Sequence, residues 1–331
     1  MKPIIISLFM LGTFSCQPQT NTKKTMEHKT DTKEVNPLLC DVETGMCEMP
    51  GNATHEKTSL PATQKPVKII YFTDPICSSC WGIEPQLRKL KLEYGDVIDI
   101  EYRMGGLLPD WSYNSGGISK PSDVAHHWDE VSLHYQMPID GDVWLEDPLN
   151  SSYPPSIAYK AAQLQDKGKA NVFMRRIREM VFLEKKNITK WEHIQQAAQE
   201  AGLDVATLKT DYEGQANQLF KDDLTLAKQM GVRGFPTMFF ADAANNQKIV
   251  YGSKPYEAYE QAILELFPAA KKQAFDKSAT ALFAYYPTLT AKEFSILSGM
   301  TVPESITTLD KLYREKYLKK TETKNGSLWK R

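Results

Sequence analysis

Two cysteines separated by two residues carry the clearest chemical signal in the sequence, Cys77 and Cys80. The apolar run 68–72 before them predicts a buried strand, and apolar residues at helical spacing over 83–94 predict a helix after them. Cys77 is therefore expected at a helix start, where unpaired N–H groups and the helix dipole stabilise a thiolate. A thiolate attacks disulfides, and Cys80 is placed to resolve the mixed disulfide that forms.

A second stretch lies far downstream, at the start of another apolar strand. It reads Gly-Val-Arg-Gly-Phe-Pro-Thr over 231–237. Together with Asp-Pro-Ile-Cys-Ser-Ser-Cys-Trp over 74–81, it resembles the DsbA family of thiol–disulfide oxidoreductases. The resemblance covers residues 66–268 and is nearest the branch of FrnE-like proteins and Spx/ClpXP adaptor proteins.

The resemblance implies an α/β thioredoxin-like fold with a helical insertion over about 111–230. It implies a cis bond between Phe235 and Pro236, whose backbone would pair with an extended substrate beside the catalytic cysteines. Trp81 is expected to pack beside the pair and to share in substrate binding. Glu84 is either a proton carrier or an ordinary acidic residue in a first helical turn. No cofactor and no metal are implied.

The two residues between the cysteines tune the redox couple. Strongly oxidising relatives carry Pro-His, whereas this chain carries Ser78 and Ser79. Hydroxyl groups can donate to the thiolate but supply no cationic charge. A less oxidising couple is therefore expected, with its direction left open.

The N-terminus resembles a bacterial lipoprotein signal. A short apolar run over 3–14 ends at Ser15 and Cys16, with Thr13 where Leu is usual. Cys16 would become the lipidated first residue after cleavage, leaving the chain anchored in the cell envelope, facing the periplasm or exterior. The alternative is a cytoplasmic protein. Residues 17–65 are polar and predict a flexible tether.

The tether carries a second cysteine pair, Cys40 and Cys47, around a turn at Gly45. Three interpretations stay open. The pair forms a local structural disulfide, or it is a second redox pair that exchanges with Cys77 and Cys80, or the four cysteines bind zinc.

Two groups of basic residues have a solvent-facing interpretation. Arg175, Arg176 and Arg178 interleave with apolar residues and are expected on the outer face of an amphipathic helix. The segment 269–331 predicts helices and a hairpin at Asn325-Gly326, in the manner of a small winged helix. Its basic edge suits DNA, but an exported chain meets none, so a packing or partner-docking appendage is expected. The formal net charge of −1 argues against a polyanion-coating protein.

These observations predict an enzyme, a protein disulfide oxidoreductase acting through Cys77 and Cys80. Its partners would be protein thiols and disulfides, an unidentified redox recycling partner and, through Cys16, a membrane. No nucleic acid is expected. The alternative is a thioredoxin-like adaptor of the Spx/ClpXP-adaptor type, which uses its cysteines for redox sensing or zinc binding.

Overall fold

The computed structural model describes residues 40–42, 45–48, 64–112 and 120–331. The signal predicted at 1–16, including Cys16, and most of the tether lie outside the described residues. Within the described part of the chain, no helix is long and apolar enough to cross a membrane.

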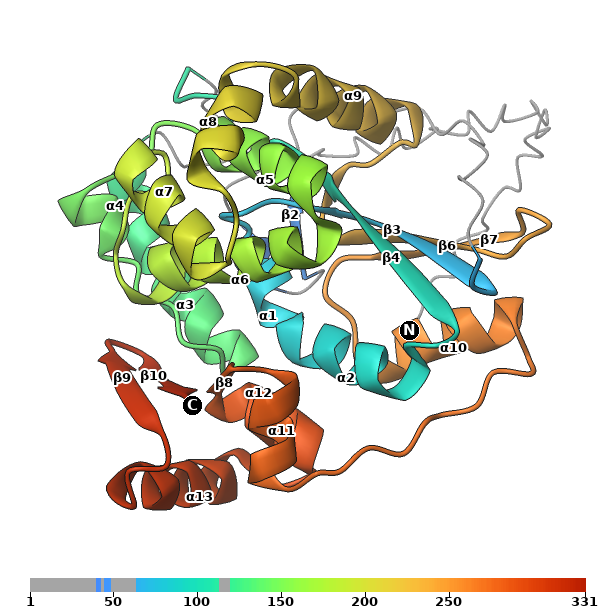
Figure 1. Cartoon of the computed structure of the whole chain (residues 1–331), viewed down its shortest axis with the longest axis vertical. Helices are drawn as coiled ribbons and strands as arrows, with labels where there is room; N and C mark the ends of the chain where they lie inside the picture. The colour runs from blue at the N-terminus through green and yellow to red at the C-terminus, as the bar shows by residue number, and fades with distance from the viewer. Residues whose placement is uncertain (1–39, 43–44, 49–63, 113–119) are drawn as a thin grey trace, which may run out of the picture. The chain divides into compact units, whose positions relative to one another are not determined.

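A four-stranded mixed sheet forms the centre of the expected thioredoxin-like fold (Figure 1). β3 (Val67–Thr73) pairs in parallel with β4 (Ile98–Met104) and antiparallel with β6 (Thr237–Ala241), which pairs antiparallel with β7 (Gln247–Tyr251). All residues of β3 are buried, as a strand covered on both faces requires. β3, α2 and β4 form a parallel βαβ unit, and β6 and β7 form an antiparallel hairpin.

The helix that follows Cys77 is interrupted. α1 (Ser78–Gly82) is followed after one residue by α2 (Glu84–Tyr94), which carries Pro85 in its first turn. Pro85 has no N–H to donate to the carbonyl of Trp81, and its ring crowds that carbonyl. The single helix expected here is therefore two segments. α2 and α10 (Tyr256–Leu266) lie on the same side of the sheet in Figure 1.

The insertion is helical, as expected. It comprises α3 (Pro121–Tyr135), α4 (Val143–Glu146), α5 (Tyr153–Gln165), α6 (Lys167–Leu183), α7 (Trp191–Glu200), α8 (Val205–Glu213) and α9 (Ala216–Gln229). The break between α8 and α9 lies at Gly214, the C-cap residue of α8. The N-cap residue of α7 is Lys190, whose side chain makes no capping hydrogen bond, and the hydroxyl of Thr189 donates to Asn187.

A short N-terminal hairpin joins the domain within the segment expected to be a tether. β1 (Cys40–Asp41) and β2 (Met46–Glu48) pair antiparallel, and β2 also pairs with β5 (Gly234–Phe235). The exposed edge of β5 supplies the hydrogen-bonding partner that this polar segment lacks by itself.

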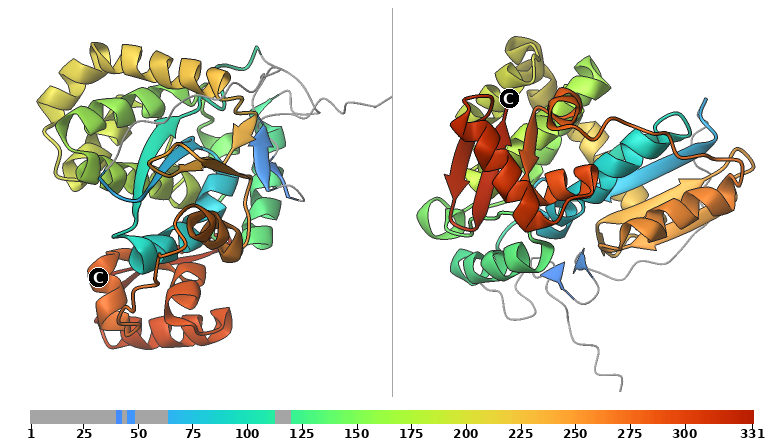
Figure 2. Two further views of the ribbon diagram at one scale, coloured as in Figure 1. Left: turned by 90° about the vertical axis from the view of Figure 1, so that its right-hand side faces the viewer. Right: turned by 90° about the horizontal axis from the view of Figure 1, so that it is seen from below.

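Residues 279–330 form a C-terminal appendage. Its order is α11 (Ala279–Tyr285), β8 (Thr288–Thr290), α12 (Ala291–Ser298), α13 (Val302–Arg314), β9 (Lys319–Thr323) and β10 (Gly326–Lys330). The strands form a separate sheet in the order β8-β10-β9 (Figure 2), and Phe294 and Trp329 belong to its own apolar core. This is the helix and strand order of the winged helix that the sequence predicted.

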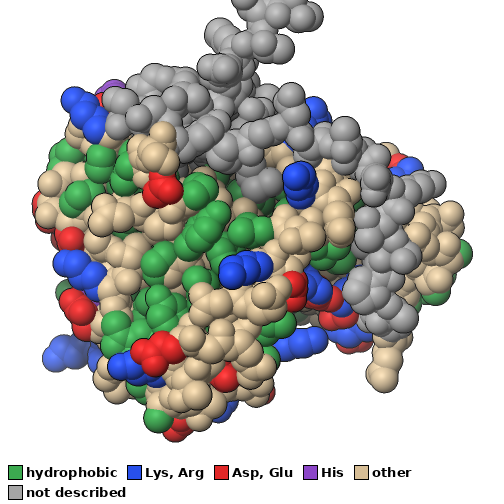
Figure 3. Space-filling model, turned by 90° about the horizontal axis from the view of Figure 1, so that it is seen from above, with side chains coloured by type: hydrophobic (Ala, Val, Ile, Leu, Met, Phe, Trp, Pro, Cys, Tyr) green, Lys and Arg blue, Asp and Glu red, His purple; other side chains and the backbone are tan. Residues whose placement is uncertain are grey.

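The basic residues of the appendage are partly neutralised. Lys324 forms ion pairs with Asp129 and Asp142 at 2.6 and 2.8 Å, and Lys320 pairs with Asp310 at 3.0 Å. Figure 3 shows a different face, seen from above the view of Figure 1; on its described part, basic and acidic side chains are interspersed around apolar ones. These ion pairs fit a packing appendage better than a surface for a polyanion.

Candidate active site

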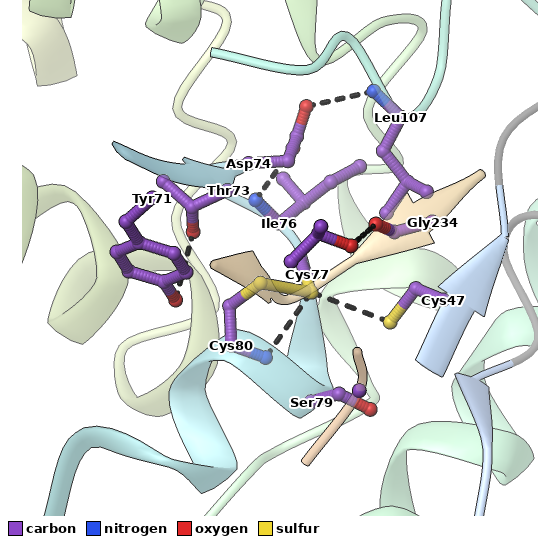
Figure 4. Close-up of a disulfide and its surroundings, with 12 residues drawn as sticks. Cys47, Tyr71, Thr73, Asp74, Ile76, Cys77, Ser79, Cys80, Leu107 and Gly234 are labelled. Carbon is purple, nitrogen blue, oxygen red and sulfur yellow. Dashed lines mark hydrogen bonds between the residues drawn. A yellow bond between two sulfur atoms is a disulfide. The ribbon is translucent and has the colours of Figure 1, made fainter. Parts of the chain in front are cut away.

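Cys77 caps the N-terminus of α1, the position that the sequence predicts. Its Sγ accepts the N–H of Cys80 at 3.1 Å, and the two residues are joined in a disulfide with Cα atoms 5.2 Å apart (Figure 4). Both residues are fully buried. In the reduced pair, the same N–H and the positive end of α1 stabilise a thiolate at Cys77.

The insertion covers the turn between the cysteines. Tyr135 of α3 donates its hydroxyl hydrogen to Ser79 Oγ at 3.1 Å. The ring of Tyr135 also occupies the space above Gly82, where an added Cβ would lie 2.5 Å from it. Tyr135 thus shapes the active-site turn, and no local pattern in the sequence singled it out.

Cys47 brings a third sulfur to the pair. Its Sγ lies 3.3 Å from Cys77 Sγ, and its side chain is fully buried (Figure 4). Cys47 is itself disulfide-bonded, and the register of the hairpin places Cys40 directly opposite it. Among the residues that the structure describes, no cluster of His, Cys, Asp and Glu that could hold a metal ion is found. Of the three interpretations of the N-terminal pair, the contact with Cys77 favours redox exchange.

The peptide bond between Phe235 and Pro236 is cis, as the resemblance implied. Phe235 is fully buried, and its ring fills the space beside Gly105, where an added Cβ would lie 1.7 Å from the ring. The backbone of Phe235, expected to receive a substrate, is here paired with Cys47 of β2.

Comparison with known proteins agrees with this geometry. Residues 71–261, more than half of the chain, match the family model described as thioredoxin. The chain belongs to the DsbA-like thioredoxin family. A Nitrosomonas europaea crystal structure, provisionally named a protein disulfide isomerase, shares the fold with a TM-score of 0.52 at 20% identity, over 62% of this chain and 97% of that one.

Two relatives of this thioredoxin-family chain are named ClpXP adapter protein SpxH. The relative from Halalkalibacterium halodurans is 34% identical over 301 residues, which cover 89% of this chain and 97% of the relative. The relative from Bacillus subtilis is 29% identical over 272 residues, which cover 81% of this chain and 90% of the relative.

Asp74 is a fully buried acid three residues before Cys77. One carboxylate oxygen accepts the N–H of Ile76 at 3.0 Å, and the other accepts the N–H of Leu107 and the hydroxyl of Ser152, both at 2.8 Å. The carboxylate thereby ties the loop before Cys77 to the segment after β4 (Figure 4). Through Ser152 it also ties this loop to the insertion. The sequence motif contained Asp74, but its three partners are brought to it by the fold.

Asp74 should make stability depend on pH. Burial raises the pKa of Asp74 from 3.8 to about 6, although its hydrogen bonds and Arg178 oppose the rise. The folded chain therefore holds this proton more tightly than the unfolded chain, so stability falls as pH rises from about 4 to 6. Two pKa units correspond to about 3 kcal/mol. Compared with Asp74→Asn, the unmodified chain should lose about that much between pH 4 and 7 in urea unfolding; a difference independent of pH would contradict the assignment.

Trp81 packs inside the fold, and its share in substrate binding stays a prediction. The residue is fully buried, its indole N–H donates to the carbonyl of Pro138 at 3.0 Å, and its ring stacks on Phe182. The guanidinium of Arg175 lies 4.4 Å from the centre of the indole ring. The insertion thus encloses Trp81 and holds α1 in place.

Glu84 is held in an ion pair. Its carboxylate lies 2.6 Å from the guanidinium of Arg178, which is 1% exposed and also donates to Thr73 Oγ1 at 2.6 Å. This arrangement accounts for Glu84 without proton transfer; the proton-carrier role stays a prediction. The outer-face interpretation of the arginines is wrong for Arg178, which bonds to Thr73 of β3 and Glu84 of α2. It is also wrong for Arg175, whose side chain is 13% exposed and pairs with the buried Glu293.

Proposed function

We propose that the chain is a protein-binding adaptor of the ClpXP-adapter type, with Cys77 and Cys80 as its redox-sensitive part. The observation that carries the proposal is the extent of the relationship to the Halalkalibacterium halodurans adapter. The 301 aligned residues exceed the length of the thioredoxin domain over 66–268, so the similarity extends into the flanking segments. An adaptor needs a surface for each partner, and the appendage offers one beyond the redox site.

Exposed apolar side chains on α13 support a docking role for the appendage. Ile306 and Tyr313 are seven residues apart on one helix face and are 40% and 46% exposed. Met300, just before the helix, is 41% exposed. Apolar anchors on a helix face, surrounded by polar residues, suit the groove of a protein partner.

Degradation of Spx by purified ClpXP tests the adaptor. The full chain at equal concentration is expected to speed Spx loss several-fold, and Ile306→Ser with Tyr313→Ser should remove most of the gain. Leu264→Ser, which replaces a 36% exposed residue on α10, is the matched control and should change little. An unchanged rate of Spx loss with the full chain would contradict the adaptor proposal.

A second candidate is the thiol–disulfide oxidoreductase, favoured by the three sulfurs around Cys77 and the cis Pro236 beside them. It would act on protein thiols and disulfides and need a redox recycling partner. Turnover of a protein disulfide should then be lost in Cys77→Ser, whereas acceleration of ClpXP by an adaptor survives that change.

The cellular location separates the two candidates further. ClpXP is a cytoplasmic protease, and a lipid-modified Cys16 on the mature chain would place the protein in the cell envelope. Mass spectrometry of the N-terminus in cells decides between them. A lipidated Cys16 would exclude the adaptor and favour the oxidoreductase.

A further inference from the structure

The N-terminal hairpin, β1 and β2, occupies the strand position beside the cis proline. In β2, Cys47 pairs with Phe235 and Glu48 with Gly234, antiparallel to β5. This edge directly precedes cis Pro236. Main-chain pairing at such an edge is how an extended segment of another protein is received. The hairpin therefore lies where a substrate strand would lie, yet it belongs to the same chain.

This docking brings two sulfurs to a reactive distance. Cys47 Sγ lies 3.3 Å from Cys77 Sγ, within the range of about 3–3.5 Å that is typical of atoms poised to react. Cys77 is also the cysteine at the helix start, where a thiolate is stabilised. Cys77 Sγ therefore lies beside Cys47 Sγ and is also the sulfur whose thiolate the helix start stabilises.

A glycine anchors the hairpin in this position. The N–H of Ser253, just after β7, donates to the carbonyl of Gly45 at 2.6 Å. Gly45 has a φ of +66°, and an added Cβ would lie 2.7–2.8 Å from atoms of Ser253. Both the left-handed backbone and the close approach require glycine here. The contact is specific and lies away from the sulfurs.

We propose that Cys47 is a third redox residue, and that the hairpin disulfide, formed with Cys40, exchanges with the Cys77–Cys80 pair inside the folded chain. What supports this pairing is the strand register, which places Cys40 opposite the disulfide-bonded Cys47, and the bond that already joins Cys77 to Cys80. This inference goes beyond the adaptor proposal and needs only that the cysteines exchange.

The exchange balances without a further oxidant once an external dithiol has reduced Cys77 and Cys80. The Cys77 thiolate attacks Cys47 Sγ, a Cys47–Cys77 bond forms, and Cys40 leaves as a thiolate. The Cys80 thiolate then attacks Cys77 Sγ, which restores the Cys77–Cys80 disulfide and releases Cys47 as a thiolate. Two electrons pass from the buried pair to the hairpin pair, and the protons lost by Cys77 and Cys80 end on Cys40 and Cys47.

The position of the hairpin also controls access to the site. Cys47, Cys77 and Cys80 are all fully buried while β2 is docked. A foreign protein strand can reach β5 only after β2 has left it. The hairpin disulfide is therefore the first that a reduced Cys77 meets, before any external protein.

Trapping the mixed disulfide tests the proposal in the full chain, with Cys16→Ser in every variant to remove one thiol. The variant Cys40→Ser/Cys80→Ser leaves Cys47 and Cys77. The control Cys47→Ser/Cys80→Ser leaves Cys40 and Cys77. After equilibration in glutathione buffers, non-reducing peptide mass spectrometry should find an equilibrium constant at least about tenfold larger for Cys47–Cys77 than for Cys40–Cys77, because docking raises effective concentration. Equal constants would overturn the proposal.

A second comparison separates docking from mere tethering. Gly45→Ala in the Cys40→Ser/Cys80→Ser background should lower the Cys47–Cys77 constant about tenfold, because the clash with Ser253 undocks the hairpin. Gly202→Ala is the control, since Gly202 has a φ of +71° but open space around its Cβ position. An equal constant in both would show that docking is not needed and would overturn the proposal. The assay contains no ClpX or client, so its outcome is independent of the adaptor proposal.

Discussion

Replacing Glu293 by alanine is expected to cost about 3–5 kcal/mol and to loosen the C-terminal appendage, because it leaves two buried guanidinium groups without their shared partner. Glu293 is fully buried; Arg175 holds its carboxylate through two hydrogen bonds of 2.7 and 3.1 Å, and Arg88 lies 3.2 Å away. Burial alone would raise the pKa of Glu293, yet Arg175 and Arg88 lower it. The ionised form is therefore the stable one, and its contribution should be lost as pH falls below about 4.5.

The chain contains its own control for this experiment. Glu304 occupies the same third position of a capping box in α13 as Glu293 does in α12, but Glu304 is exposed and meets no arginine in the ion pairs described. Glu304→Ala should cost only about 1 kcal/mol, the usual value of a cap. Hydrogen exchange of α12 and β10 measures both variants. Equal protection in the two variants would mean that the buried ion pairs do not hold the appendage.

Replacing Arg178 by alanine should be similarly costly, about 3–5 kcal/mol, because it removes one partner of a buried ion pair. Arg178 pairs with Glu84 at 2.6 Å and donates to Thr73 Oγ1 and to the carbonyl of Asp74. These bonds join α6 to the end of β3 and to α2, on either side of the active-site turn. Urea unfolding measures the loss of stability. The rate at which iodoacetamide alkylates reduced Cys77 should also change, because the active-site turn is disturbed.

Arg176 provides the matched control on the same helix. Its side chain is 15% exposed and pairs with Glu184 and Glu200, whose side chains are 26% and 37% exposed. Water reaches these pairs more easily than the Arg178–Glu84 pair, so Arg176→Ala should cost less than Arg178→Ala, about 1 kcal/mol. If the two alanine variants unfold at the same urea concentration, the expected larger loss of stability on removing the buried Arg178 is contradicted.

Local spacing was enough to predict the chemistry of the site. The apolar strand, the Cys77–Cys80 spacing and the following helical pattern are all contained in a short stretch of chain, so they predict a reactive cysteine at a helix start. The cis bond before Pro236 was predicted from the family resemblance, because the bond before a proline is only rarely cis in folded proteins.

Long-range packing decided which side chains complete the site. Arg176 and Arg178 look alike in the sequence, and α6 turns one toward Glu84, 94 residues earlier, and leaves the other near the surface. Trp81 and Glu293 became buried for the same reason, through neighbours on other elements.

The largest difference between the expectation from the sequence and the structure concerns the second cysteine pair. From the sequence, exchange of Cys40 and Cys47 with Cys77 and Cys80 was one of three open interpretations, and nothing in the polar segment around them selected it. The free edge of β5 and the space around Gly45 exist only once β3, β6 and β7 have formed the sheet. Local signals therefore specify the Cys77–Cys80 pair and the thioredoxin-like elements around it. The contact of Cys47 with Cys77 depends on a strand edge built from residues about 190 positions away, and no local pattern encodes such an edge.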